Sequence, residues 1–303
     1  MSMPFDTPAA AVPALRATRP FYWSVRRELW EHRALWIVPL VIAGLIVVAA
    51  MFPHASMQID SADVATPQKY RDLFALFHAV LTVPQLLLLS VLLPYYLLDC
   101  LYAERKDRSI LFWKALPVSD AQTVLSKLLV ALVVVPLGVF VLTLFTDVAA
   151  SAILDVRFHN SPMVRALLHW DTGIWLRTQG LILAAVAVAV LWYAPIAAYL
   201  MLISAWARRN AFLWAALPPL VAMLIEKIAF GTHEIAKLLG YRLHLPSGVL
   251  GINPAAAGGH AAGMFDTMRP WVAFVNIDFW LGLAVAAALV WLTIRIRRHQ
   301  EDG

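Results

Sequence analysis

Residues 104–119 hold the side chains best suited to a specific interaction. Five consecutive charged residues run from Glu104 to Arg108 and are followed by the apolar quartet Ile110–Trp113. The charges need water or a protein partner, and the quartet needs burial in lipid headgroups or in a groove. A basic flank of a membrane span would explain the arginines, but it would not require Asp107 or the aromatic pair. Mixed charges beside an aromatic anchor are typical of a protein docking site.

Sequence motifs for other chemistry are absent. The chain has no G-x-x-x-x-G-K-[ST], G-x-G-x-x-G, G-x-S-x-G or H-E-x-x-H pattern, which removes the usual signatures of nucleotide binding, hydrolysis and zinc proteolysis. His233-Glu234 lacks the second histidine, and Cys100 is a lone cysteine. We therefore expect no catalytic residue, no cofactor and no metal in this chain.

The composition is that of a membrane protein. Of 303 residues, 61% are hydrophobic and only 14% are charged, and the mean hydropathy is +0.73. Soluble domains are about 45–50% apolar and about 25% charged, so an ordinary soluble enzyme is excluded. Intrinsic disorder is excluded as well, because it requires low hydrophobicity.

Apolar segments long enough to cross a bilayer occur six times, since a transmembrane helix needs about 20 largely apolar residues. We predict an all-α polytopic fold with spans at about 35–52, 73–98, 128–145, 180–207, 211–230 and 271–294. Residues 1–20, rich in proline and alanine, are expected to form a flexible tail, and residues 21–303 a single transmembrane domain. The polar stretch before the first span does not resemble a cleaved signal peptide.

The distribution of basic residues predicts the orientation. Six spans place both termini on the same side of the membrane. Fifteen lysines and arginines then lie on that side, and nine lie on the other side, which has longer loops. The positive-inside rule makes the first side cytoplasmic. The predicted cytoplasmic segments are 1–33, 101–122, 208–210 and 295–303. The predicted outer segments are 53–70, 150–172 and 232–268.

Polar residues are scarce within the predicted spans. The acidic residues nearest to them fall at span ends: Asp99, Asp147, Glu226 and Asp278. Well inside the second span, only His78 and Gln85 are strongly polar. Because ionisable groups within a bilayer mark ion pathways, this pattern argues against an ion-coupled transporter and predicts a mostly apolar substrate route.

With these segments in place, the chain resembles the permease subunit of ABC-2 type ATP-binding-cassette transporters. The resemblance rests on Glu104–Lys114 followed by Leu116-Pro117-Val118-Ser119, and on Arg26–Arg33 directly before the first span. It implies a dimeric permease and a separately encoded cytoplasmic ATPase that binds ATP and magnesium. It also implies a connecting helix before the first span, a coupling helix between spans two and three, and short re-entrant helices before span six.

The resemblance assigns two sets of residues. Those expected to contact the ATPase are Glu104, Arg105, Lys106, Asp107, Arg108, Ser109, Phe112, Trp113, Lys114 and Pro117. Those of the connecting helix are Arg26, Arg27, Glu28, Trp30, Glu31 and Arg33. The function implied is ATP-driven export of an amphipathic or apolar substrate across a bacterial inner membrane. A membrane-embedded lipid-modifying enzyme, or an anchor or sensor without transport, are the alternatives.

Overall fold

All regular structure is helical in the part of the chain that the computed structural model describes, residues 20–52, 67–107, 118–158, 170–245, 249–250 and 268–299. Six helices in it are long and apolar enough to cross a membrane. Their bounds are Ala34–Met51, Leu73–Lys106, Asp120–Arg157, Thr172–Trp206, Ala211–Phe230 and Ile277–His299. The predicted class, an all-α chain with six candidate membrane spans, is therefore confirmed. The predicted tail lies almost entirely outside the described residues.

The third candidate span is much longer than predicted because polar residues extend it at both ends. It consists of α7 (Asp120–Leu129), the π-helical turn η2 (Val130–Val134) and α8 (Val135–Arg157). Ser119 and Gln122 form a reciprocal capping box at its start, as expected for a serine before a helix. The π-helical turn ends two residues before Pro136, which lacks the N–H of a regular helical hydrogen bond.

The second candidate span is interrupted at Leu88. It consists of α3 (Pro67–Leu87), α4 (Leu89–Asp99) and the short α5 (Tyr102–Lys106). Pro84 and Pro94 flank the interruption, and each removes one backbone hydrogen bond from the helix. The break in the helix thus falls between the two prolines.

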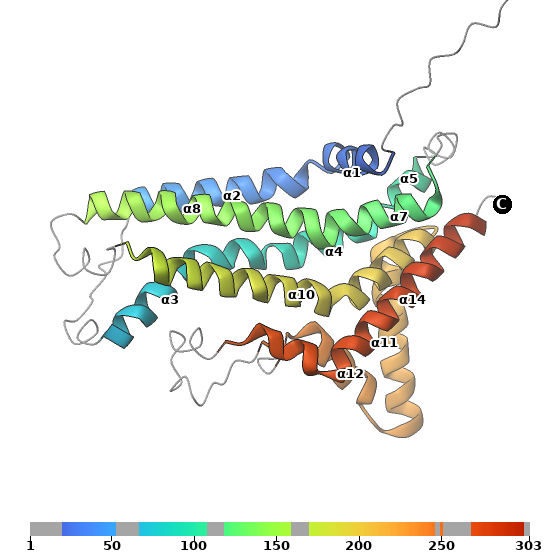
Figure 1. Cartoon of the computed structure of the whole chain (residues 1–303). Coiled ribbons are helices and arrows are strands. Elements are labelled where there is room, and N and C mark those ends of the chain that lie inside the picture. The colour runs from blue at the N-terminus through green and yellow to red at the C-terminus, as the bar shows by residue number, and fades with distance from the viewer. Residues whose placement is uncertain are drawn as a thin grey trace, which may run out of the picture.

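The core is built from helices packed along their lengths (Figure 1). α2 (Ala34–Met51) lies beside α8, and α10 (Thr172–Trp206) lies beside α14 (Ile277–His299). At Gly138 on α8, an added Cβ would lie 2.5 Å from the Trp36 ring of α2. Glycine at this position therefore leaves the space that the edge of the Trp36 ring occupies.

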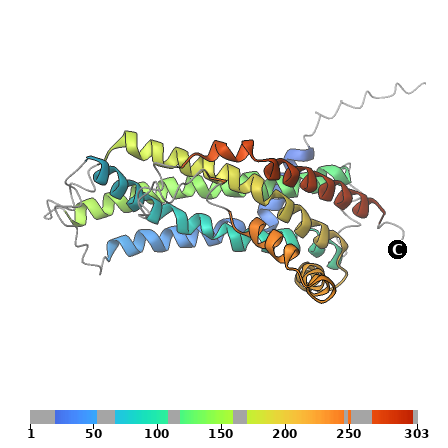
Figure 2. The same ribbon diagram turned by 90° about the horizontal axis from the view of Figure 1, so that it is seen from below.

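The fifth candidate span, α11 (Ala211–Phe230), runs across the direction of the other helices. Figure 1 shows it along its length, and Figure 2 shows it almost end on. It follows α10 after a tight turn in which Asn210 adopts a left-handed conformation (φ 49°), which asparagine tolerates better than most residues. The very short connection predicted at residues 208–210 is confirmed.

Two short helices precede the sixth candidate span. They are α12 (Glu234–Leu243), in the predicted outer segment, and the 3-10 helix η3 (Pro270–Val275). The sixth span was predicted to begin at 271, but residues 271–275 belong to η3 and the span begins at Ile277. The Glu226 carboxylate on α11 accepts hydrogen bonds from the backbone N–H groups of Glu234 (2.5 Å) and Ile235 (2.9 Å). Glu226 thereby caps α12, because a carboxylate satisfies the free N–H groups of a helix N-terminus.

The other end of α12 is attached to the main bundle. The Arg242 guanidinium lies over the Trp192 ring of α10, 4.4 Å from its centroid, and donates a hydrogen bond to the backbone carbonyl of Asp278 on α14. Trp192 Nε1 in turn donates to the Arg242 carbonyl (3.1 Å). Gly282 leaves room for the guanidinium, since a Cβ there would lie 2.7 Å from Arg242 Nη1.

Candidate functional site

A buried cluster of charged side chains joins four helices at the end of the bundle where α14 terminates. Lys127 of α7 is completely buried, and its Nζ donates to Glu28 Oε1 (2.6 Å) and lies 3.0 Å from Glu104 Oε1. Glu28 belongs to α1 (Pro20–Glu31), and Glu104 to α5. Arg297 of α14 donates from Nη1 to Glu104 Oε2 (2.9 Å). We call these residues, with Arg27 and Asp120, the ionic cluster.

The charges in the ionic cluster balance. Arg27 donates from Nη2 to both Glu28 (3.0 Å) and Glu104 (2.9 Å), and Arg297 Nε donates to Asp120 (3.0 Å). Within the cluster, three cations therefore face three carboxylates, and the exposed Glu31 carboxylate lies 3.4 Å from Arg27 Nε at its edge. Balance is needed, because an unpaired charge buried at this depth would cost several kcal/mol.

Neutral groups complete the surroundings of Glu28. The Tyr96 hydroxyl donates to Glu28 Oε2 (3.2 Å), and the His32 ring lies edge-on to Tyr96 with 4.8 Å between the ring centroids. Burial by itself raises the pKa of Glu28, but Lys127 and Arg27 outweigh that effect, so the pKa lies below the ordinary 4.5. Burial lowers the pKa of His32 below 6.5 despite the nearby Glu28 charge. At neutral pH Glu28 is therefore ionised and His32 neutral.

The lowered pKa of Glu28 predicts a loss of stability in acid. A carboxylate whose pKa is lower in the folded chain stabilises the fold above its unfolded pKa and ceases to do so as pH falls through the folded value. We expect wild type to melt at a higher temperature than Glu28→Gln at pH 7, and this difference to shrink as pH falls below about 4.5. Thermal unfolding in detergent micelles between pH 3 and pH 7 measures it. A difference that is constant over this range would contradict the assignment.

A second set of bonds joins the ends of the second and fourth candidate spans. Arg105 Nη2 donates to the backbone carbonyls of Ser204 (2.5 Å) and Ala207 (2.7 Å) at the end of α10. Ser204 Oγ accepts hydrogen bonds from the backbone N–H groups of Leu101 (3.1 Å) and Tyr102 (3.0 Å). The carbonyls that α10 cannot satisfy within itself are thus used to hold α5 in place.

The described members of the predicted ATPase-contact set divide into two groups. Glu104, which is only 6% exposed, and the partly buried Arg105 form hydrogen bonds within the chain. The short helix α5 turns these two charges of the run into the bundle, where their bonding groups are already used. Lys106 and Asp107 are exposed. The remaining predicted contacts lie outside the described residues: Arg108, Ser109, Phe112, Trp113, Lys114 and Pro117.

The predicted helix before the first span is present as α1, and its residues divide between two faces. Glu28 is buried and Arg27 is half-buried, and both contribute to the ionic cluster. Trp30 is 64% exposed, and the Arg26 guanidinium lies between it and Trp23, within 5.5 Å of each ring centroid. Arg33 follows α1 and is also exposed, as is Glu31.

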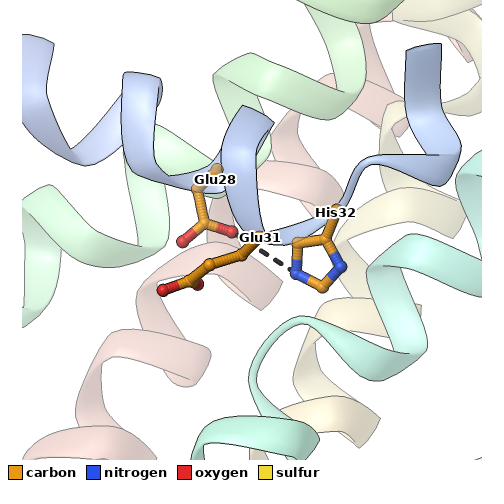
Figure 3. A group of neighbouring side chains, drawn as sticks. All are labelled: Glu28, Glu31 and His32. Atoms are coloured by element: carbon orange, nitrogen blue, oxygen red, sulfur yellow. Dashed lines mark ion pairs between the residues drawn. The ribbon is translucent and has the colours of Figure 1, made fainter. Parts of the chain in front are cut away.

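Glu28, Glu31 and His32 place three potential metal ligands within 4.8 Å of one another (Figure 3). A metal ion does not fit this group. Glu28 already binds Lys127 and Arg27, and the Lys127 ammonium, 2.6 Å from Glu28 Oε1, would repel a cation. His32 Nε2 lies 3.8 Å from Glu28 Oε2, as marked in Figure 3, so the arrangement is explained by the ionic cluster.

A second buried polar cluster lies on α3, α8 and α10, towards their opposite ends. Asp147 is completely buried and accepts three hydrogen bonds. Its donors are His78 Nδ1 (2.8 Å), Trp175 Nε1 (2.7 Å) and Gln179 Nε2 (3.0 Å). An ionised carboxylate can only accept, so the contact with His78 requires a proton on Nδ1 whenever Asp147 is ionised. We call these four residues the Asp147 cluster.

Sequence reasoning missed the Asp147 cluster. Asp147 was placed at a span end, but α8 continues to Arg157 and leaves it well inside the helix. Trp175 and Gln179 were not recognised because the fourth span was predicted to begin at 180, whereas α10 begins at Thr172. The available signal was the four-residue spacing of Trp175 and Gln179, which puts both side chains on one helix face.

No protein-family model, curated protein or solved structure matches this chain.

Proposed function

We propose that this chain is the membrane-spanning permease subunit of an ATP-driven exporter of the ABC-2 type. Its task is mechanical: a separate ATPase moves against the segment after α5, and the spans follow. The single observation that carries the proposal is that both flanks of residues 107–119 are bonded into the bundle. Glu104 and Arg105 anchor the first flank, and Asp120 and Lys127 anchor the second.

This arrangement suits the transmission of force. The ionic cluster links the two flanks to α1 and to α14, and Arg105 links the first flank to α10. A displacement of residues 107–119 is therefore applied to these three helices at once, because short charge-assisted hydrogen bonds resist stretching. The pair of ATPase subunits would supply the displacement, and a second permease copy would complete the substrate route.

The proposed partner contact predicts a large effect at Trp113. Trp113→Ala should weaken the affinity between permease and ATPase by roughly 30-fold or more, because a desolvated aromatic anchor contributes about 2 kcal/mol or more. Less ATPase should then be recovered with the permease. Copurification from cells that express both chains measures this. Trp271→Ala, at an exposed tryptophan of η3, is the matched control and should retain the ATPase.

Normal ATPase recovery and transport with Trp113→Ala would contradict the coupling role. The partner to test is the product of a neighbouring reading frame with a G-x-x-x-x-G-K-[ST] motif. The same experiment separates the permease from a lipid-modifying enzyme or a membrane anchor, since neither of these needs an ATPase.

The proposed location is a bacterial inner membrane with both termini cytoplasmic. A cysteine at Ser109 should then resist a membrane-impermeant thiol reagent in intact cells and react after permeabilisation. Val156→Cys, at a 76% exposed position near the end of α8, should react in intact cells. Buried Cys100 contributes little background. Labelling of Ser109→Cys in intact cells would contradict the proposed orientation and indicate the opposite one.

A further inference from the structure

An open apolar groove runs between α7, α10 and α14 on the outside of the bundle. Its volume is about 410 Å³. Ala194 of α10 and Ala286 of α14 are both nearly buried in it, and their short side chains make the groove deep. Leu128 of α7 and Ile294 of α14 border it, and every other side chain that lines it is also apolar or aromatic.

The groove ends beside two arginines. Trp291 and Ile294 line it, and Arg295 and Arg298 follow each of them by four residues, on the same face of α14. The Arg295 guanidinium lies over the Trp291 ring, 4.7 Å from its centroid. Both arginines are exposed, and among the described residues neither pairs with a carboxylate. Arg297, between them, turns away into the ionic cluster.

We propose that this groove binds an anionic phospholipid of the leaflet at that end of the bundle. A fatty-acyl chain occupies the apolar groove, and Arg295 and Arg298 bind the phosphate-containing headgroup. Basic residues at the end of a hydrophobic crevice between helices are suited to such headgroups, and arginine binds phosphate oxygens in a bidentate manner. Such a lipid would bind any membrane-spanning form of this bundle, with or without an ATPase.

Native mass spectrometry of the detergent-solubilised chain tests the proposal, because it resolves the binding of single lipid molecules. The probes are phosphatidylglycerol and phosphatidylcholine with identical acyl chains. Wild type should bind the first phosphatidylglycerol at least five-fold more tightly than the first phosphatidylcholine, since one basic residue near a membrane surface contributes about that factor. Arg295→Gln with Arg298→Gln should abolish the preference.

A second pair of variants tests the groove itself. Ala287 lines the groove and is exposed, whereas its exposed neighbour Ala288 does not line it. Ala287→Trp should fill the groove and weaken the affinity for the first molecule of either lipid several-fold. Ala288→Trp should leave this affinity unchanged. Arg208→Gln with Arg209→Gln, at exposed arginines of the α10–α11 turn, removes the same charge elsewhere and should retain the preference.

Three outcomes would overturn the proposal. The preference for phosphatidylglycerol could persist without Arg295 and Arg298, or both tryptophan variants could bind lipid alike, which would indicate unspecific contact with the bilayer. The spectra could instead show a dimer that Ala287→Trp dissociates, which would assign the groove to a second copy of the chain. Wild-type unfolding temperatures of the variants exclude misfolding as a cause.

Discussion

Lys127→Met is expected to destabilise the folded chain by about 3–5 kcal/mol, the range found when one partner of a buried ion pair is removed. Methionine fits the volume of the lysine side chain but leaves Glu28 and Glu104 with one cation fewer at a completely buried position. The two carboxylates then repel each other. The midpoint of thermal unfolding in detergent micelles measures the loss.

The neighbouring helix supplies the control for this variant. Lys106→Met removes a lysine from an exposed position on α5 and should change the unfolding midpoint little. Adding Glu104→Gln to Lys127→Met should recover part of the lost stability, because it removes one of the two facing carboxylates. If Lys127→Met melts like Lys106→Met, the ionic cluster does not stabilise the fold.

Asp147→Asn is the second substitution with a large expected effect, a loss of about 2–4 kcal/mol. The carboxylate accepts from His78, Trp175 and Gln179. Asparagine offers one oxygen and turns an N–H donor towards the other partners, and each buried donor left without an acceptor costs about 1–3 kcal/mol. Unfolding in detergent measures this loss too.

Asp155→Asn is the matched control, since Asp155 lies two turns further along α8 and is exposed. It should melt like wild type. His78→Phe should cost less than Asp147→Asn, because it removes one donor and leaves two for the carboxylate. Equal unfolding midpoints for the two asparagine variants would show that Asp147 does not hold α3, α8 and α10 together.

The candidate spans could be read from the sequence because hydrophobicity is a local property. Twenty apolar residues in a row indicate a span wherever they occur, and all six were found. Their ends were less predictable: the third helix extends to Asp120 and Arg157 because capping and burial of polar side chains stabilise turns that hydrophobicity alone does not indicate.

The ionic cluster could not be read from the sequence, because its members are far apart in the chain. Glu28 and Lys127 are 99 residues apart, and Glu104 and Arg297 are 193. Glu104 contacts three cations from three other helices, so Glu104→Lys would place a fourth cation beside Arg27, Lys127 and Arg297 and should be as severe as Lys127→Met.

The spacing of the two polar clusters along one continuous helix sets a length scale for the whole molecule. Lys127 and Asp147 are twenty residues apart on α7, η2 and α8, and at 1.5 Å per residue this is about 30 Å, the thickness of the hydrocarbon core of a typical bilayer. The two clusters would therefore lie at its two boundaries. In a thinner or thicker membrane, one of them must enter hydrocarbon or the bundle must tilt, at a cost that grows with each ångström of mismatch. The distance between the two clusters therefore selects for bilayers whose hydrocarbon core is about 30 Å thick.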